Sequence, residues 1–309
     1  MAKIAILGFG TVGSGVYEVL CRNAAGVSRR AGEPVEVKYI LDPKDFSDHP
    51  AAQLFIKNFD AILEDPEVKV VVETIGGTRF AYPYVKACLE SGRSVCTSNK
   101  EMVATYGAEL LGLAKEHGCA FLFEASVGGG TPIITPMHQC LAANVITEVE
   151  GIVNGTTNFI MDAMHKAPVD FPAILKEAQD LGYAEADPSA DIDGDDIRRK
   201  LCISANIAFD AALEETAIPT FGIRTVTAAD IAAFRAHGFA CKLLARAEST
   251  DSGVCAYVEP TLVGAGDLEA AVPANFNLIT YEAEQLGRQS FYGQGAGRFP
   301  TAEHVVQDC

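Results

Sequence analysis

The 309-residue sequence lacks the signals of an exported or membrane-spanning protein. Its first ten residues, MAKIAILGFG, pass from a short apolar run directly into glycines, without the apolar core and small-residue cleavage site of a signal peptide. No apolar run approaches the roughly 20 residues that cross a bilayer. We therefore expect a cytoplasmic protein.

Cysteine pairs are also missing. The nine cysteines stand singly between Cys21 and Cys309, and no two of them form a CxxC motif. This spacing argues against a disulfide framework and against a zinc knuckle.

Basic residues are scarce, with 24 Lys and Arg against 41 Asp and Glu and a formal charge of -17. Such a charge would repel phosphate backbones and anionic membranes, so we expect neither nucleic acid nor a membrane as a partner. The hydrophobic fraction of 49% and the charged fraction of 21% are ordinary for a globular protein. The length suggests two domains at about 150 residues each.

The first 130 residues alternate short apolar runs with helical patterns. We predict strands at residues 3–7, 35–41, 68–72, 94–97 and 120–123, with helical spacing between them at 12–21, 82–91 and 107–117. Strands that alternate with helices predict an α/β fold, here a Rossmann-type, doubly wound parallel sheet.

The pattern changes after about residue 130. Residues 146–153 and 254–263 alternate like strands with one wet face, and long helical stretches lie between them at 171–181 and 195–211. We predict a second, α+β domain.

A glycine-rich turn, GFGTVG, joins the first predicted strand to the first predicted helix. Gly8 would permit the tight turn, Gly10 the close approach of a pyrophosphate to the backbone, and Gly13 the close packing of helix on strand. Glycines could also serve only the turn, but their place between a strand and a helix favours a dinucleotide site.

Asp42 follows the second predicted strand, where an acid would bind the adenosine ribose and favour NAD. An acid at a strand end is also a common turn residue. Lys44 and Lys57 follow it, and a basic residue would favour the 2′-phosphate of NADP, so the sequence leaves NAD and NADP open.

The stretch DIDGDDIRRK, residues 191–200, is dense in charge. Asp196 and Lys200 are four residues apart, on one face of the helix that we predict after Gly194. On spacing alone a surface ion pair is the favoured interpretation. The stretch also resembles the start of a calcium loop at Ser189, but the twelfth position, where a glutamate is needed, is Lys200, so we reject a calcium site.

Several long motifs follow one another along nearly the whole chain. They are GFGTVGSGV from residue 8, TSNKE from 97, FEASVGGGTPII from 123, NGTTN from 154, GYAEADPSAD from 182, the positions Gly194, Asp196 and Lys200, and GQGAGRFPTA from 293. Together, and in this order, these motifs resemble the homoserine dehydrogenase family. The resemblance implies an NAD(P)-dependent oxidoreductase that interconverts L-aspartate 4-semialdehyde and L-homoserine, on the route to threonine, methionine and isoleucine.

The resemblance also implies roles for individual residues. Lys200 is the candidate proton donor, Asp196 would hold it and bind substrate, and Lys100 matches a second family lysine where cofactor and substrate meet. Which lysine transfers the proton stays open. Further substrate-binding positions are Glu185, which matches the acid for the substrate ammonium group, Asp191, Tyr183, Gly155 and Thr156. Cofactor-binding positions are Gly8, Gly10, Thr11, Val12, Gly13, Asp42, Lys100 and Gly297.

A monovalent cation, usually sodium, is implied as well. Its ligands would be backbone oxygens, which suit a hard cation, in a glycine-rich turn at Glu124, Val127, Gly129 and Thr131. From the residues alone this is a glycine-rich turn before Pro132.

The family also implies a discontinuous first domain, because Gly295 and Gly297 match a segment that returns to the cofactor domain. We predict a dinucleotide-binding domain of residues 1–130 with 286–309, and a substrate-binding, catalytic and dimerisation domain of residues 131–285. Family members pair through the sheet of the second domain, so we expect a homodimer.

Two rival functions fit less well. Aspartate-semialdehyde dehydrogenase needs a nucleophilic cysteine, and none of the nine cysteines stands in an evident activated setting. A nucleotide-binding regulator without activity would be expected to lack Lys100, Asp196 or Lys200, and all three are present.

Overall fold

A computed structural model describes all residues, 1–309, in two compact units. The first unit comprises residues 1–130 and 297–309, and the second comprises residues 131–296. None of the helices is both long and apolar enough to span a membrane.

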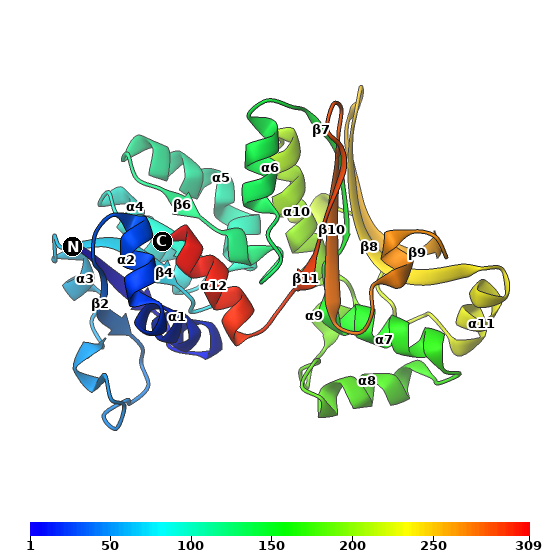
Figure 1. The fold of residues 1–309 in the computed structure, drawn as a ribbon, viewed down its shortest axis with the longest axis horizontal. Helices are drawn as coiled ribbons and strands as arrows, with labels where there is room; N and C mark the ends of the chain where they lie inside the picture. Colours follow the sequence, from blue (N-terminus) through cyan, green and yellow to red (C-terminus); the bar gives the residue numbers. More distant parts are fainter. The chain divides into compact units, whose positions relative to one another are not determined.

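The first unit contains a six-stranded parallel sheet in the order β3-β2-β1-β4-β5-β6 (Figure 1). The order reverses between β1 and β4, as in the dinucleotide-binding version of the doubly wound fold. The strands are β1 (Ala2–Leu7), β2 (Val35–Leu41), β3 (Phe55–Ile56), β4 (Val68–Glu73), β5 (Ser94–Thr97) and β6 (Phe121–Leu122).

Helices cover both faces of this sheet, so along its strands the side chains that point to either face are buried. On one face Ile4, Ile6 and Val72 pack with Val16 of α1 and Val305 of α12, while Ala5, Val71 and Val95 are buried on the other. α12 packs beside α1 although the two lie at opposite ends of the chain (Figure 1). The helices are α1 (Thr11–Arg22), α2 (Ala24–Ala31), α3 (Asp60–Leu63), α4 (Ala81–Glu90), α5 (Lys100–Glu116) and α12 (Arg298–Asp308), with 3-10 turns η1 (Ala52–Leu54) and η2 (Glu124–Ser126).

The second unit contains a five-stranded antiparallel sheet in the order β11-β10-β7-β8-β9. Val149 and Ile279 face α10, which packs on β7 and β8 and beside α6. The strands are β7 (Ile146–Ile152), β8 (Phe239–Thr250), β9 (Gly253–Gly264), β10 (Phe276–Ala283) and β11 (Gly287–Gln294). The helices are α6 (Ile134–Leu141), α7 (Gly155–Lys166), α8 (Phe171–Asp180), α9 (Ser189–Ile192), α10 (Asp195–Phe209) and α11 (Ala228–Ala236), with 3-10 turns η3 (Glu215–Ala217) and η4 (Leu268–Ala271).

The predicted boundary at residue 286 is wrong. Residues 287–294 form β11, which pairs along its whole length with β10, so they belong to the sheet of the second unit. The chain returns to the first unit only at Gly297. The reason is the alternating pattern of GRQSFYGQ, in which every second residue is exposed.

Candidate active site

The glycine-rich turn of the first unit has little room for side chains. Gly8 has a φ of +89°, in the left-handed region, and a Cβ on Gly13 would lie 2.0 Å from the Gly8 carbonyl oxygen. Gly10 caps α1 without a side-chain hydrogen bond, and space is open where its Cβ would be. The first amides of α1, which begins with Thr11 and Val12, therefore have no side-chain cap, the arrangement in which a helix N-terminus binds phosphate.

Asp42 lies beside this turn at the end of β2 and is buried. One carboxylate oxygen accepts a hydrogen bond from the Phe9 amide at 2.7 Å, and the other from the Lys44 amide at 2.9 Å. The Lys57 ammonium group donates to the Asp42 carbonyl oxygen at 2.8 Å. Asp42 therefore holds the glycine-rich turn to the segment after β2, and each oxygen keeps a lone pair for a ribose hydroxyl.

Gly297 caps α12 with a φ of +125°. The helix that it starts packs against α1 so closely that a Cβ on Gly15 would lie 2.9 Å from the Arg298 carbonyl oxygen. In the second unit, a Cβ on Gly295 would collide with the buried Asn277 side chain. Close packing thus requires a glycine at residue 295, and the positive φ favours one at residue 297.

The predicted pair of Asp196 and Lys200 lies on α10 and is buried, not on the surface. Gly194 caps the helix in the left-handed region, with a φ of +90°. The Lys200 ammonium group lies 2.8 Å from an Asp196 carboxylate oxygen and 2.7 Å from the Val153 carbonyl oxygen. Asp196 and Lys200 expose 3% and 7% of their surfaces, so the pair does not belong to the solvated class that spacing alone favoured.

Asn154 connects this pair to Asp191. Its side-chain amide nitrogen donates to an Asp191 oxygen and to an Asp196 oxygen, both at 2.8 Å. Its side-chain oxygen accepts from the Thr157 amide at 2.9 Å and so caps α7. Asn154 was not among the predicted site residues, although an Asn directly before GTT is a typical helix cap.

Burial and the nearby Asp196 carboxylate raise the pKa of Asp191, while the hydrogen bond from Asn154 opposes the shift. Asp191, Asp196 and Lys200 are therefore one coupled set of charges. Two acids beside one lysine leave an excess of negative charge, which suits a ligand with a cationic amine.

The other predicted substrate residues lie at two places. The Thr156 hydroxyl donates to the Tyr183 carbonyl oxygen at 2.6 Å, and Gly155 lies so close to the chain that a Cβ would be 2.7 Å from the Asn275 carbonyl oxygen. The Gly155 contact brings the start of α7 to the segment before β10, and the Thr156 hydrogen bond brings it to the segment after α8. Glu185 is exposed on that segment, and its carboxylate is not part of the hydrogen-bonded cluster of Asn154.

Lys100 is the first residue of α5 and is half-buried. Asn99 caps the helix, because its side-chain oxygen accepts from the Met102 amide at 3.1 Å. The cap fixes where the Lys100 side chain leaves the backbone, at the carboxyl end of β5, where doubly wound sheets bind their ligands.

The remaining charges of DIDGDDIRRK form ion pairs within the second unit. These pairs stabilise the ends of α9 and α10 and take no part in the Asn154 cluster. They are Asp193 with Arg224 at 2.8 Å, Asp195 with Arg198 at 2.7 Å, and Arg198 and Arg199 with Glu215 at 3.0 and 3.3 Å.

The predicted cation loop is buried and held by α12. His304 Nδ1 donates to the Gly129 carbonyl oxygen at 2.7 Å, and an Asp308 carboxylate oxygen accepts from the Glu124 amide at 3.0 Å. Gly129 adopts a φ of +58°. In the second unit the buried Thr131 hydroxyl has no hydrogen-bond partner. No cluster of three or more His, Cys, Asp or Glu side chains could hold a metal ion, so a cation here would depend on backbone oxygens.

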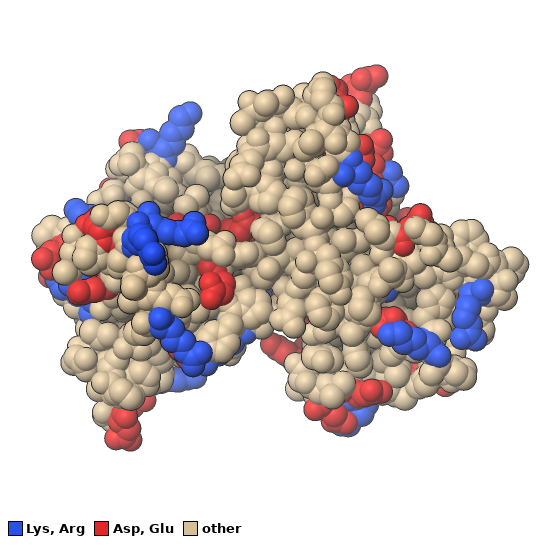
Figure 2. Space-filling view, viewed as in Figure 1, with Lys and Arg blue, Asp and Glu red and all other residues tan.

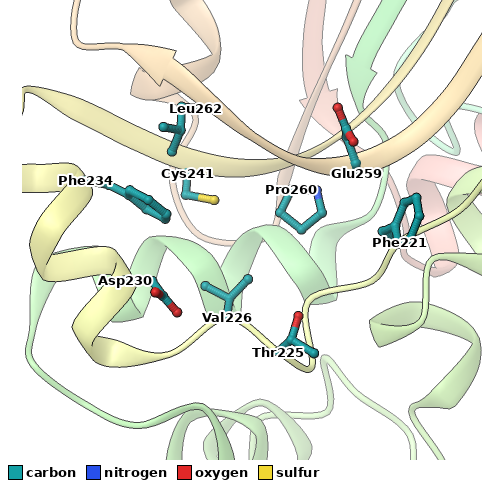
Figure 3. A pocket seen from close by; sticks show the side chains of 9 residues that line it. All are labelled: Phe221, Thr225, Val226, Asp230, Phe234, Cys241, Glu259, Pro260 and Leu262. Carbon is teal, nitrogen blue, oxygen red and sulfur yellow. The ribbon is translucent and has the colours of Figure 1, made fainter.

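One hollow of the second unit lies away from these residues. It is an open pocket of about 440 Å³ between α11, the segment before it and the strands β8 and β9 (Figure 3). Its lining includes Phe221, Phe234 and Leu262 but no predicted substrate residue.

On the face shown in Figure 2, acidic and basic side chains are interspersed without a continuous basic tract.

Three of the buried cysteines are poor nucleophiles. Burial raises the pKa of Cys88 to about 12 and that of Cys202 and Cys241 to about 11. A nucleophilic cysteine needs the opposite shift.

Comparisons with known proteins agree with the motifs. Residues 8–124 match the model of the homoserine dehydrogenase NAD-binding domain, and residues 132–309 match that of homoserine dehydrogenase. The homoserine dehydrogenases of Bacillus subtilis and Pseudomonas aeruginosa are 40% and 42% identical to the chain, over 99% of the chain and 71% of each relative.

Solved structures give the same result. A homoserine dehydrogenase from Thiobacillus denitrificans superposes with a TM-score of 0.95 at 39% identity, over 99% of this chain and 72% of that one. A hyperthermophilic archaeal homoserine dehydrogenase in complex with NADPH superposes with a TM-score of 0.83 at 27% identity, over 99% of this chain and 96% of that one. The chain belongs to the homoserine dehydrogenase family of NAD(P)-dependent oxidoreductases.

Proposed function

We propose that the chain interconverts L-aspartate 4-semialdehyde and L-homoserine with Lys200 as the proton donor. The observation that carries this assignment is the buried cluster of Lys200, Asp196, Asn154 and Asp191. A buried lysine held by one carboxylate and one carbonyl oxygen is a fixed proton source, whereas a surface pair would exchange freely with solvent.

In the reducing direction the aldehyde carbon would receive a hydride, which a nicotinamide cofactor held by the glycine-rich turn of the first unit would supply. The C–O double bond becomes a single bond, and its electron pair goes to the oxygen. Lys200 gives one ammonium proton to that oxygen, which yields the hydroxyl of homoserine, and is protonated again from solvent. Asp196 holds the lysine at 2.8 Å and stabilises its charged form before the transfer.

Lys100 is the second candidate for the proton transfer. It starts α5, and the cap by Asn99 fixes its position at the carboxyl end of the parallel sheet. We assign Lys200 the transfer because its ammonium group already lies in a cluster with two carboxylates that suit the substrate amine.

The substrate ammonium group would bind among the acids of the second unit, Glu185, Asp191 and Asp196. Asp191 and Asp196 share the Asn154 amide, so a cation between them would offset their repulsion. Tyr183, Gly155 and Thr156 would form the wall around the substrate, since the Thr156 hydroxyl fixes the Tyr183 backbone.

The cofactor would bind at Gly8, Gly10, Thr11, Val12 and Gly13, with its pyrophosphate on the uncapped N-terminus of α1. The Asp42 carboxylate would accept a hydrogen bond from a ribose hydroxyl. Lys44 and Lys57 both form hydrogen bonds with Asp42. This combination of one acid and two lysines accommodates NAD or NADP. Gly297 would belong to the same site through α12, which packs on α1.

A sodium ion would bind the backbone oxygens of Glu124, Val127, Gly129 and Thr131. The left-handed Gly129 and the unpartnered Thr131 hydroxyl fit such a site, because hard cations favour oxygen ligands. The ion would have a structural role, and no step of the reaction passes through it.

A homodimer would form through the sheet of the second unit. Its face opposite α10 presents Tyr292, with 54% of its surface exposed, and the partly exposed Arg246 and Arg288. Arg246 lies 3.0 Å from Glu148, and Arg288 lies 2.6 Å from Glu269. Aromatic and arginine side chains are enriched at interfaces. Light scattering after gel filtration would measure the mass of the assembly in solution and so test the homodimer.

The cytoplasmic location of the protein stays a prediction.

The assay for this function follows nicotinamide absorbance with homoserine plus NAD or NADP. The wild-type protein is expected to reduce at least one cofactor only when homoserine is present. If the wild-type protein reduced neither cofactor, the assigned function would be wrong. If Lys200→Ala kept full activity, only the role of Lys200 as proton donor would be wrong.

A further inference from the structure

One fully buried acid of the first unit has no role in the site described so far. Glu73 ends β4 and pairs with Leu7 of β1 on one side and with Thr97 of β5 on the other. The strand order reverses between β1 and β4. Doubly wound sheets bind their ligands outside the carboxyl ends of the strands at this reversal, so Glu73 lies at the floor of the nucleotide crevice.

Three donors converge on the Glu73 carboxylate. One oxygen accepts from the Ile75 amide at 2.7 Å and the Gly76 amide at 3.2 Å, and the other accepts from the Thr97 hydroxyl at 2.6 Å. Burial raises the pKa of Glu73, and these hydrogen bonds oppose the shift. Both oxygens of the Glu73 carboxyl group are thus occupied, one by two backbone amides and the other by a hydroxyl.

Two loops at the crevice depend on these bonds. The segment after β4 turns through Gly76 and Gly77, which both have positive φ, and its amides point back to Glu73. In the same segment the Thr74 hydroxyl donates to the Gly8 carbonyl oxygen at 3.0 Å, which joins it to the glycine-rich turn.

Thr97 carries the connection to the second loop. Its hydroxyl oxygen accepts from the Asn99 amide at 2.9 Å, and the Asn99 side chain donates to the Gly77 carbonyl oxygen at 2.7 Å. The same Asn99 caps α5, whose first residue is Lys100. Glu73, Thr97 and Asn99 therefore tie residues 74–77 to residues 98–100 in one buried network.

We propose that Glu73 is a positioning residue for the cofactor site, and that the hydrogen bonds of its buried carboxyl group fix the two loops that receive the cofactor and present Lys100. This inference rests on the proposed role of the first unit as the cofactor site. It adds an acid that binds no ligand itself and acts through the backbone of residues 75 and 76 and the hydroxyl of Thr97.

The donors explain why an amide does not reproduce every bond of the acid. In Glu73→Gln the side-chain nitrogen must face either the two backbone amides or the Thr97 hydroxyl. In the first case three donors oppose one another. In the second the Thr97 hydroxyl oxygen accepts from the new amide, and its own proton loses the Glu73 oxygen. Either arrangement weakens the connection to one of the two loops, although the volume of the side chain is kept.

The test compares Glu73→Gln and Thr97→Val with the wild type, with Thr97→Ser as the matched control that keeps the hydroxyl. Fluorescence titration measures the Kd of NADPH and NADH, and steady-state assays measure KM for homoserine at saturating cofactor. We expect a roughly tenfold higher cofactor Kd in Glu73→Gln and Thr97→Val, near wild-type Kd in Thr97→Ser, and unchanged homoserine KM in all.

Three results would overturn the inference or its basis. Equal cofactor Kd for Glu73→Gln and the wild type would remove the positioning role alone. Parallel increases in cofactor Kd and homoserine KM, with a lower melting temperature, would show general destabilisation instead. No cofactor binding by the wild type would remove the proposed function itself. If Glu73→Gln does not fold, Thr97→Val against Thr97→Ser decides, because Thr97→Val removes only one of the three bonds to the carboxylate.

Discussion

The proposed sites of the two units offer their ligands different chemical groups. The first unit offers backbone: glycines that let a pyrophosphate approach and helix amides without a side-chain cap. Its acids, Asp42 and Glu73, accept hydrogen bonds from backbone amides and so fix the conformation of the adjoining loops. The second unit offers charged side chains, Lys200, Asp196 and Asp191, held together by the Asn154 amide.

This difference follows from the ligands. A dinucleotide is large and has its charge on phosphates, which suit backbone amides in a helix N-terminus. An amino acid is small, and its reaction needs a proton at one atom, which only a placed ionisable side chain can supply. Changes to the first site should therefore alter cofactor binding, and changes to the second should alter the chemical step or substrate binding.

The largest expected effect is on the chemical step. Lys200→Ala is expected to lower kcat about a thousandfold, because the ammonium proton is lost from the oxygen that receives negative charge. The Kd of the cofactor, measured by fluorescence titration, should stay within a few-fold of the wild type. The matched control is Lys166→Ala, which removes an exposed lysine on α7. If Lys200→Ala instead lost cofactor affinity a thousandfold and kept its kcat, Lys200 would serve cofactor binding and not the chemical step.

The next effect separates the two glycines of the turn. In Gly13→Ala the new Cβ would lie 2.0 Å from the Gly8 carbonyl oxygen, so the turn must shift, with a lower melting temperature and a cofactor Kd raised on the order of a hundredfold. In Gly10→Ala no atom lies within 4 Å of the new Cβ, so stability should be kept while the cofactor, which needs that space, binds less tightly. Equal melting temperatures for the two variants would contradict this assignment.

The parallel sheet could be predicted because its signals are local. Residues 3–7, 35–41, 68–72 and 94–97 are short apolar runs with helical patterns between them, and strands lie at or near each of them. The predicted helix at 195–211 closely matches α10 (Asp195–Phe209). The strand β8 (Phe239–Thr250) was not predicted, because its many apolar residues do not alternate and its role depends on pairing with β7 and β9.

The site could be predicted only in part. Spacing placed Asp196 and Lys200 on one face of a helix, but their burial depends on the packing of α10 against β7 and β8. Asn154 lies 42 residues from Asp196, so only the fold joins them. Glu73 had a weak local signal, an acid directly after three valines at the end of a buried strand.

A smaller effect tests the link between Asn154 and the charged cluster. Asn154→Ser keeps a cap for α7 but loses the amide that joins Asp191 to Asp196, so their repulsion grows. We expect homoserine KM to rise roughly tenfold, with little change in the Kd of the cofactor. Thr157→Ser, which keeps a hydroxyl beside the same cap, is the control. An unchanged KM in Asn154→Ser would mean that the cluster does not bind the substrate.

The last effect concerns stability, not binding or turnover, and measures what buried charge costs in the second unit. Lys242 on β8 exposes 2% of its surface, and its ammonium group donates to the Asn158 side-chain oxygen at 2.9 Å and the Val272 carbonyl oxygen at 2.7 Å. Burial lowers the pKa of Lys242 from 10.5 to about 8. Below pH 8 the lysine is protonated in both the folded and the unfolded chain, and the folded state bears the full cost of the buried charge.

Between pH 8 and about 10.5 the folded chain loses this proton before the unfolded chain does, so the cost disappears as the pH rises. Relative to Lys242→Met, which has no proton to lose, the wild type should gain up to about 3 kcal/mol of unfolding free energy across this window. Urea unfolding of both proteins at pH 7 and pH 9.5 measures the difference, and Lys166→Met, at an exposed site, should show no such gain. The prediction fails if the difference in unfolding free energy between the wild type and Lys242→Met stays constant, or shifts in favour of the variant at high pH. The neutral partners Asn158 and Val272 would then compensate the buried charge fully, and burying this charge would cost the second unit nothing.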